Sequence, residues 1–201
     1  ERTGSTNADL KAQALQGAPH GRALVAGEQV GGRGRLGRTW EGGGDNLALS
    51  VLCRPSLTVD RVALTCLATA VAVCRVLGEP FRIKWPNDVL GPDGRKVAGI
   101  LAEMESEAAR IAWLVVGVGV NVGSAPLPVA TSVAEVTGRR PERAALAAFL
   151  VRAILAEVER VGVEPAETLA DWKRMDGTLG KFVKVGEVSG TAVDVELSGA
   201  L

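Results

Sequence analysis

Two long stretches of the chain carry apolar residues in a helical pattern. Residues 58–77 consist almost entirely of Ala, Val, Leu and Cys, and Gly78 follows. A helix that is apolar nearly all round is buried, and a glycine often ends a helix. Residues 141–162 form a second helical pattern with Pro141 at its start, where proline is favoured. Shorter helices are predicted at 8–16, 131–138 and 165–174.

Between these helices lie short apolar runs of the kind that form strands. The runs cover residues 22–29, 47–53, 81–84, 96–105 and 110–122. The last two are separated by only four residues, which predicts an antiparallel pair. Strands often follow one another without an intervening helix, so the pattern favours an α+β fold with a mixed sheet over a doubly wound parallel sheet.

The pattern changes near residue 178. From there on, short alternating runs are separated by glycine, which predicts a new, small β unit that the chain does not complete. We therefore predict a main domain over residues 1–177 and a partial β domain over residues 178–201.

Composition narrows the classes of function. The 23 basic and 23 acidic residues cancel, so net charge gives no argument for binding nucleic acid or a membrane surface. Apolar residues make up 47% of the chain and mean hydropathy is +0.18, which allows a large core. No apolar run reaches 18 residues, so no transmembrane helix is expected. A single histidine gives little support to a histidine-based metal cluster or a Ser-His-Asp triad.

Three cysteines occur without a CxxC pair, at Cys53, Cys66 and Cys74. An odd number of unpaired cysteines indicates buried thiols in a reducing compartment rather than a disulfide framework. We therefore expect the protein to be cytoplasmic.

Residues 32–37 read GRGRLG and match the dinucleotide-binding pattern GxGxxG. That pattern requires a helix to open at the last glycine, and residues 38–44 cannot open one, so we reject a Rossmann site. The segment is instead a loop with Arg33, Arg35 and Arg38, whose guanidinium groups suit phosphate or carboxylate oxygens. Two alternatives stay open, a solvated basic loop and a nucleic-acid contact.

Three other features are ambiguous when each is taken alone. The turn at Pro86, Asn87 and Asp88 places polar groups at the end of a strand, although such side chains often cap their own turn. Lys96 opens the next strand, and lone lysines are usually solvated. Glycines at 117 and 119 interrupt a bulky strand, which indicates either close packing or a flat ligand against that face.

Taken together, the motifs have a recognisable order. Ser5-Thr6-Asn7, Gln29 with GRGRLGRTW, KWPNDVL, GRKVAGIL and GVGVN strongly resemble the catalytic domain of biotin protein ligases. The resemblance implies a class II tRNA-synthetase-like domain followed by a small SH3-like domain. It also implies that biotin and ATP, with Mg²⁺, form biotinyl-5′-AMP, and that biotin then passes to a lysine of a biotin carboxyl carrier protein.

The resemblance also implies roles for individual residues. Lys96 and Arg35 are the expected catalytic residues. The biotin-binding set is Ser5, Thr6, Asn7, Gln29, Gly32, Arg33, Gly34, Arg35, Lys96, Gly99, Gly117 and Gly119. The ATP-binding set is Arg35, Arg38, Trp40, Asn87, Asp88, Lys96 and Asn121. Trp40 is expected to stack on adenine, and residues 117 and 119 to let the bicyclic ring of biotin lie against the strand. No tightly bound metal is expected.

The chain departs from the family pattern in two places. Only four residues precede Ser5, so the helix-turn-helix that many members carry is not expected here, nor is DNA binding. Asp194 stands where glycine is usual. The nearest rival is a lipoate ligase or octanoyl transferase of the same fold. The resemblance allows a homodimer, because exposed strand edges often pair in this family, and no membrane partner is expected.

Overall fold

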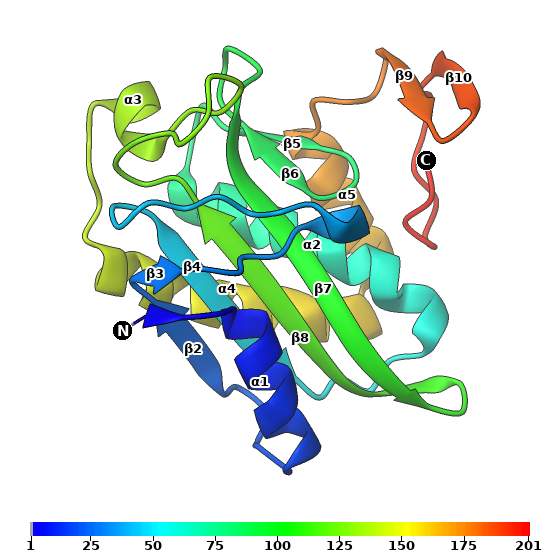
Figure 1. Ribbon diagram of the computed structural model, residues 1–201. Helices are drawn as coiled ribbons and strands as arrows, with labels where there is room; N and C mark the ends of the chain where they lie inside the picture. Colours follow the sequence, from blue (N-terminus) through cyan, green and yellow to red (C-terminus); the bar gives the residue numbers. More distant parts are fainter. Residues whose placement is uncertain (1) are drawn as a thin grey trace.

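A computed structural model describes residues 2–201, and Glu1, the first residue of the predicted catalytic domain, lies outside the described residues. Its centre is a six-stranded sheet in the order β2-β4-β8-β7-β6-β5, in which every neighbouring pair is antiparallel (Figure 1). The strands are β2 (Ala23–Ala26), β4 (Leu47–Cys53), β5 (Arg82–Lys84), β6 (Asp88–Leu90), β7 (Lys96–Glu107) and β8 (Arg110–Val120). The predicted α+β class and the antiparallel pair are confirmed.

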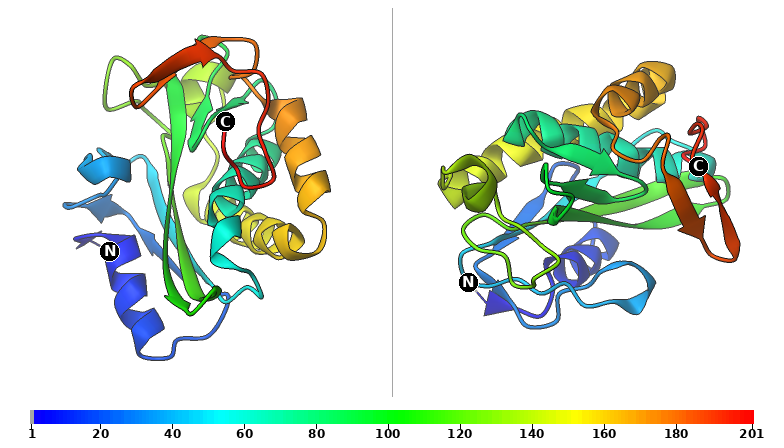
Figure 2. Two further views of the ribbon diagram at one scale, coloured as in Figure 1. Left: turned by 90° about the vertical axis from the view of Figure 1, so that its right-hand side faces the viewer. Right: turned by 90° about the horizontal axis from the view of Figure 1, so that it is seen from above.

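Helices cover both faces of this sheet. On one face lie α2 (Val62–Leu77), α4 (Arg143–Val163) and α5 (Pro165–Met175), and on the other lies α1 (Thr6–Leu15) (Figure 2). A short helix, α3 (Val133–Thr137), lies near one end. The main core fills the space between the sheet and α2 and α4, and a smaller apolar cluster lies under α1. Because α1 covers only part of its face, the rest is left for the loop that precedes β4.

The helix boundaries follow the residues that cap them. Ser5 is the N-cap of α1 and accepts a hydrogen bond from the Ala8 N–H, so the helix begins at Thr6 and includes Asn7. The α2 helix follows a turn of 3₁₀ helix, Val59–Arg61, and ends at Gly78, whose φ of +78° few other residues would adopt.

Two strand predictions need correction. The predicted strand 22–29 is divided, because β2 ends at Ala26 and β3 (Glu28–Gln29) leaves the main sheet to pair in parallel with β1 (Arg2–Thr3). Strand β6 was not predicted, because it has only three residues and directly follows a turn, so it shows no alternating pattern. This hairpin of β5 and β6 matters for the site, since it brings Asp88 opposite Gly99 of β7.

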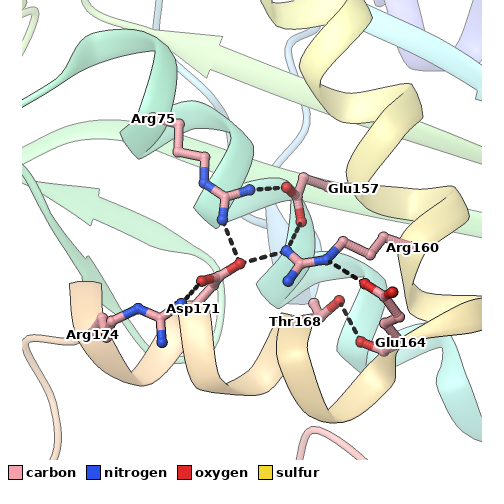
Figure 3. Close-up of polar contacts among 7 residues, drawn as sticks. All are labelled: Arg75, Glu157, Arg160, Glu164, Thr168, Asp171 and Arg174. Carbon is pink, nitrogen blue, oxygen red and sulfur yellow. Dashed lines mark hydrogen bonds and ion pairs between the residues drawn. The ribbon is translucent and has the colours of Figure 1, made fainter.

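An ionic network joins the three helices on the covered face of the sheet (Figure 3). Asp171 of α5 bonds to Arg75 of α2, Arg160 of α4 and Arg174 of its own helix, and Glu157 of α4 also pairs with Arg75. Burial favours a higher pKa for Asp171, but the hydrogen bonds and charges of Arg160 and Arg75 outweigh it, so the pKa lies below its ordinary value. The carboxylate is thus charged and fully paired at neutral pH.

The C-terminal residues form a hairpin and then return to the core. Among the strands of residues 2–201, β9 (Phe182–Val185) and β10 (Val188–Thr191) pair only with each other. The segment 192–201 packs back on the helical layer, where Val195 is 1% exposed and joins the main core. Asp194, the departure from the family pattern, lies 2.5 Å from Lys173 Nζ of α5. The predicted boundary at 177/178 stays a prediction.

All three cysteines are free thiols; Cys53 and Cys74 are buried as predicted, whereas Cys66 is only partly buried. Burial raises the pKa of Cys53 and Cys74 to about 12, so neither is a reactive thiolate at neutral pH. Among the helices that the structure describes, none is long and apolar enough to cross a membrane.

Candidate functional site

A cavity of about 120 Å³ lies where three parts of the chain meet. These are the N-terminal end of α1, the loop over residues 32–40 that carries Arg33, Arg35 and Arg38 (the arginine loop), and strands β4, β7 and β8. It is lined by residues from every motif singled out in the sequence. The lining residues are Ser5, Thr6, Asn7, Gln29, Arg33, Gly34, Arg35, Arg38, Thr39, Trp40, Ala48, Leu49, Asn87, Lys96, Gly99, Ile100, Leu101, Gly117, Val118 and Gly119. Segments that extend from Ser5 to Gly119 along the chain therefore form one site.

The polar end of the cavity is built on the first turn of α1. Gln29 Oε1 accepts hydrogen bonds from the Thr6 N–H at 2.7 Å and from Thr6 Oγ1 at 2.9 Å. Ser50 Oγ, on β4, lies 2.7 Å from Thr6 Oγ1 and 2.6 Å from Asn7 Oδ1. Thr6, Asn7 and Ser50 are buried, so these bonds form away from bulk water and hold the side chains in fixed positions.

Asn7 also reaches across the sheet to β7. Its Nδ2 donates to Glu103 Oε2 at 3.0 Å, and Lys11 Nζ donates to Glu103 Oε1 at 2.6 Å. Burial favours a higher pKa for Glu103, but the hydrogen bonds from Lys11 and Asn7 and the charges of Lys11 and Arg33 outweigh it, so the pKa lies below its ordinary value. Glu103 is therefore an ionised carboxylate beside the cavity at neutral pH.

The arginine loop is folded back on itself. The Gly34 N–H donates to Arg38 O at 2.7 Å, and Arg33 and Thr39 form an isolated β-bridge. Between them, residues 35–37 form a turn of 3₁₀ helix in which Leu36 has a φ of +57° and is 91% exposed. The closed turn directs Arg33, Arg35 and Arg38 to the cavity wall, while its apolar tip stays in solvent.

Trp40 fixes the end of this loop against the sheet. Gly99 and Gly119 face each other on β7 and β8, and a Cβ on Gly119 would lie 2.2 Å from the Trp40 ring. A Cβ on Gly99 would lie 2.9 Å from the same ring. The side chain beside Gly117 is that of Asn7. In this structure the strand glycines therefore make room for the Trp40 and Asn7 side chains, the close-packing alternative noted for them.

Lys96, which lines the cavity, forms an ion pair with Asp88. Lys96 Nζ lies 2.5 Å from Asp88 Oδ1 and 5.3 Å from the centre of the Trp40 ring. Asn87 is held beside them, because its Nδ2 donates to Ile100 O at 2.9 Å and its backbone carbonyl accepts from the Ile100 N–H. The motif residues of the KWPND turn and of β7 thus meet through the β6–β7 pairing.

Most, but not all, of the predicted site residues line the cavity. Gly32, Asp88 and Asn121 do not. Gly32 pairs with Trp40 through its backbone carbonyl, and Asp88 reaches the site through Lys96. Asn121 is buried, and its Nδ2 donates to Thr131 O at 3.1 Å and to Lys96 O at 3.4 Å. Lys84 is exposed on β5, outside the cavity.

Three polar residues in or beside the cavity are absent from the predicted site residues. They are Thr39, Ser50 and Glu103. A polar residue inside the apolar run 47–53 was the available signal for Ser50. The sequence carries no such signal for Glu103, because glutamates are common in the exposed half of a strand.

Within residues 2–201, no group of three or more His, Cys, Asp or Glu side chains could hold a metal ion. The site offers an Asp88–Lys96 pair and several arginines instead. Of these groups, the Asp88 carboxylate is the one whose oxygens suit a divalent cation, because arginine and lysine side chains carry only donors.

Comparison with known proteins agrees with this geometry. The sequence profile of the biotin/lipoate A/B protein ligase family matches residues 1–121. The chain is 36% identical over 217 aligned positions to the biotin–[acetyl-CoA-carboxylase] ligase of Mycobacterium tuberculosis, covering 99% of this chain and 79% of that relative. It is 34% identical over 152 positions to the bifunctional ligase/repressor BirA of Bacillus subtilis, covering 70% of this chain and 46% of BirA.

The fold is also that of solved ligases. The biotin protein ligase of Aquifex aeolicus, solved in complex with biotin and ATP, superposes with a TM-score of 0.79 at 29% identity, covering 99% of this chain and 87% of that one. The chain thus matches nearly the whole length of that ligase but only about half of the length of the Bacillus relative.

Proposed function

The chain belongs to the biotin/lipoate A/B protein ligase family, and from this premise we propose that it activates biotin with ATP and transfers it to a carrier protein. In the first step an oxygen of the biotin carboxylate bonds to the α-phosphorus of ATP, and pyrophosphate leaves with the electrons of the broken P–O bond. In the second step a lysine amine bonds to the acyl carbon of biotinyl-5′-AMP, AMP leaves, and the amine loses a proton.

The observation that carries this proposal is the convergence of cations and a polar helix end on one cavity. Arg33, Arg35, Arg38 and Lys96 all line it, together with the hydrogen-bonded first turn of α1. Bringing a carboxylate to a phosphate joins two anions, and charge builds on the phosphoryl oxygens as pyrophosphate leaves. Fixed cations lower that barrier.

We assign the residues as follows. Lys96 bridges the carboxylate and the α-phosphate, and Arg35 retains the adenylate. The polar end binds the ureido head through Ser5, Thr6, Asn7 and Gln29, and the loop at Gly32, Arg33 and Gly34 covers it beside Gly99, Gly117 and Gly119. ATP is contacted by Arg38, Trp40, Asn87 and Asp88. Asn121 supports Lys96 from behind through its bond to Lys96 O.

Biotin is favoured over lipoate by the polarity of the α1 end. A cyclic urea carries two N–H donors and a carbonyl acceptor, and the amides and hydroxyls of Thr6, Asn7 and Gln29 offer partners of both kinds. The dithiolane ring of lipoate has no such groups and would form no hydrogen bond with these side chains, so lipoate would lack the affinity that those bonds give to biotin.

Magnesium is proposed as the ion that accompanies ATP. Asp88 is the carboxylate that would share it with the phosphates, and the ion would offset negative charge on them when bound. We further propose a cytoplasmic location, supported by the free thiols, and a homodimer, supported by the exposed edge strand β2.

The deciding experiment is ATP–pyrophosphate exchange with biotin, with lipoate and with neither. We expect exchange only with biotin, followed by transfer to a biotin carboxyl carrier domain. Exchange that responds to lipoate but not to biotin would establish the rival activity.

A further inference from the structure

Glu103 lies beside the cavity but has no role in the function proposed above. It is partly buried, it is ionised, and it reaches α1 with both carboxylate oxygens, one bonded to Lys11 and the other to Asn7. Leu101, two residues earlier on the same face of β7, lines the cavity and pairs with Gly117 of β8.

The partner that matters most is the Asn7 amide. An asparagine amide has nearly the same shape when its oxygen and nitrogen exchange places, so its neighbours decide which group faces which way. An ionised carboxylate can only accept, and so can the Leu101 carbonyl, 3.4 Å from Asn7 Nδ2. Both require the nitrogen on the β7 side.

The opposite side of the amide is built for an acceptor. Ser50 Oγ, a possible donor, lies 2.6 Å from Asn7 Oδ1. Gly117 leaves room for the same oxygen, since a Cβ there would lie 2.2 Å from it. Asn7 lines the cavity, so the side chain presents a fixed acceptor at the polar end of the site.

We propose that Glu103 is a positioning residue that fixes the orientation of the Asn7 amide and thereby makes the polar end of the site complementary to a ligand N–H, an inference that rests on the proposed biotin ligase function. Glu103 contacts no reacting atom in this account. Its contribution is to the affinity and selectivity for the ureido head.

The first test is Glu103→Gln, which keeps the size of the side chain but can present a donor to Asn7. Biotin affinity is measured by calorimetry, and kcat and KM are measured for biotin and ATP separately. We expect the Kd and KM for biotin to rise about tenfold, the effect of one misplaced hydrogen bond, while the KM for ATP and kcat change by less than about twofold. The matched control is Glu105→Gln, an exposed glutamate two residues along the same face of β7.

The second test exchanges the two groups. In the double variant Asn7→Asp with Glu103→Gln, the new amide donates to the new carboxylate, and an acceptor faces the cavity again at unchanged net charge. We expect the double variant to bind biotin more tightly than either single variant, because Asn7→Asp alone sets two carboxylates against each other. Lys11→Met, which removes the ion pair but keeps the Glu103 carboxylate, should retain biotin affinity within about threefold.

Several results would overturn the inference. Wild-type biotin affinity in Glu103→Gln would do so, as would a double variant that binds biotin no more tightly than the single variants. An equal loss of affinity in Lys11→Met would show that the carboxylate acts only through its ion pair with α1. Failure of the proposed function itself is distinct, because the wild-type protein would then show no biotin binding.

Discussion

At the residue scale, the site depends on a few side chains whose neighbours are supplied by distant parts of the chain. Lys96 illustrates this. On the sequence it is a lone lysine at the start of a strand, whereas in the fold it pairs with Asp88 and lies over the Trp40 ring. Its surroundings distinguish it from Lys84, which is twelve residues earlier and exposed on β5.

Replacing Lys96 tests its assigned role directly. In Lys96→Ala, adenylation measured in a single turnover with labelled ATP should slow by about 10²–10³, by analogy with losing one donor to a developing oxyanion. Because the charge acts mainly in the transition state, kcat and kcat/KM should fall together while biotin affinity changes less. Lys84→Ala is the control and should keep the wild-type rate. A wild-type rate in Lys96→Ala would leave the loop arginines to offset the phosphoryl charge.

At the scale of elements, the arginine loop is held at one end by Trp40 and has little else to anchor it. Its tip is exposed, and its internal bonds close only a short turn. The glycine pair of β7 and β8 provides the seat for the indole. The loop and the sheet are therefore coupled through one aromatic contact.

Gly119→Ala should break that contact, because the added methyl group would lie 2.2 Å from the indole. We expect trypsin to cut after Arg33, Arg35 and Arg38 several times faster than in the wild type, and the KM for ATP to rise. Biotin should protect these sites in the wild-type protein. Gly190→Ala is the control, since a Cβ there has nothing within 4 Å. Equal cleavage rates in the two variants would show that Trp40 does not anchor the loop.

The ionic network of Figure 3 is a second feature at this scale, and it holds three helices together through Asp171, which is 4% exposed. Asp171→Asn would leave the arginines around it without their central carboxylate. We expect a loss of about 2 kcal/mol in the free energy of unfolding at pH 7, less than for a fully buried pair because the arginines are partly exposed. Glu167→Gln, at an exposed position of α5, should cost less than about 0.5 kcal/mol.

The same variant has a predicted pH dependence. The folded pKa of Asp171 is lowered, so its stabilisation is present above the unfolded pKa and is lost as pH falls through the folded pKa. The difference between wild type and Asp171→Asn in urea unfolding should therefore be largest at neutral pH and shrink below about pH 4. A difference that does not change with pH would assign the effect to packing.

At the scale of the whole molecule, the N-terminal and C-terminal parts of the chain pack on opposite sides of the main sheet. The N-terminal residues build the site, and the C-terminal segment closes the helical layer behind it (Figure 2). The Trp85 indole N–H donates to Gly199 O at 3.0 Å, and Arg61 donates to Leu197 O at 3.3 Å. Residues 192–201 thus contribute to the core that supports the sheet.

Two valines of this segment separate its contributions. Val195 is 1% exposed and Val193 is 85% exposed. Val195→Asp should place an unpaired charge in the core and lower the Tm of the whole protein by roughly 5–10 °C in a single transition. Val193→Asp should leave the Tm nearly unchanged. Two separate transitions, with the higher one unaffected, would show that the C-terminal residues fold independently of the core.

The sequence by itself predicted most of the elements and identified most of the polar and glycine residues that line the cavity. Continuous apolar runs predicted α2, α4 and the β7–β8 pair, because the spacing of apolar residues along the chain indicates which faces of these elements are buried. The motif residues were found because their types and order resemble those of a known family, and most of them line one cavity.

Only the tertiary structure decided how these residues meet. β6 is too short to give a sequence pattern. The apolar run 22–29 is divided between two sheets, because β2 pairs with β4 in the main sheet and β3 pairs with β1 in another. Ser50 and Glu103 join the site because both bond to Asn7, which is 43 positions from Ser50 and 96 positions from Glu103 in the chain. The partners of Gly117 and Gly119 were likewise open, because a missing Cβ indicates that something approaches closely but does not say what, and here the fold supplies the side chains of Asn7 and Trp40.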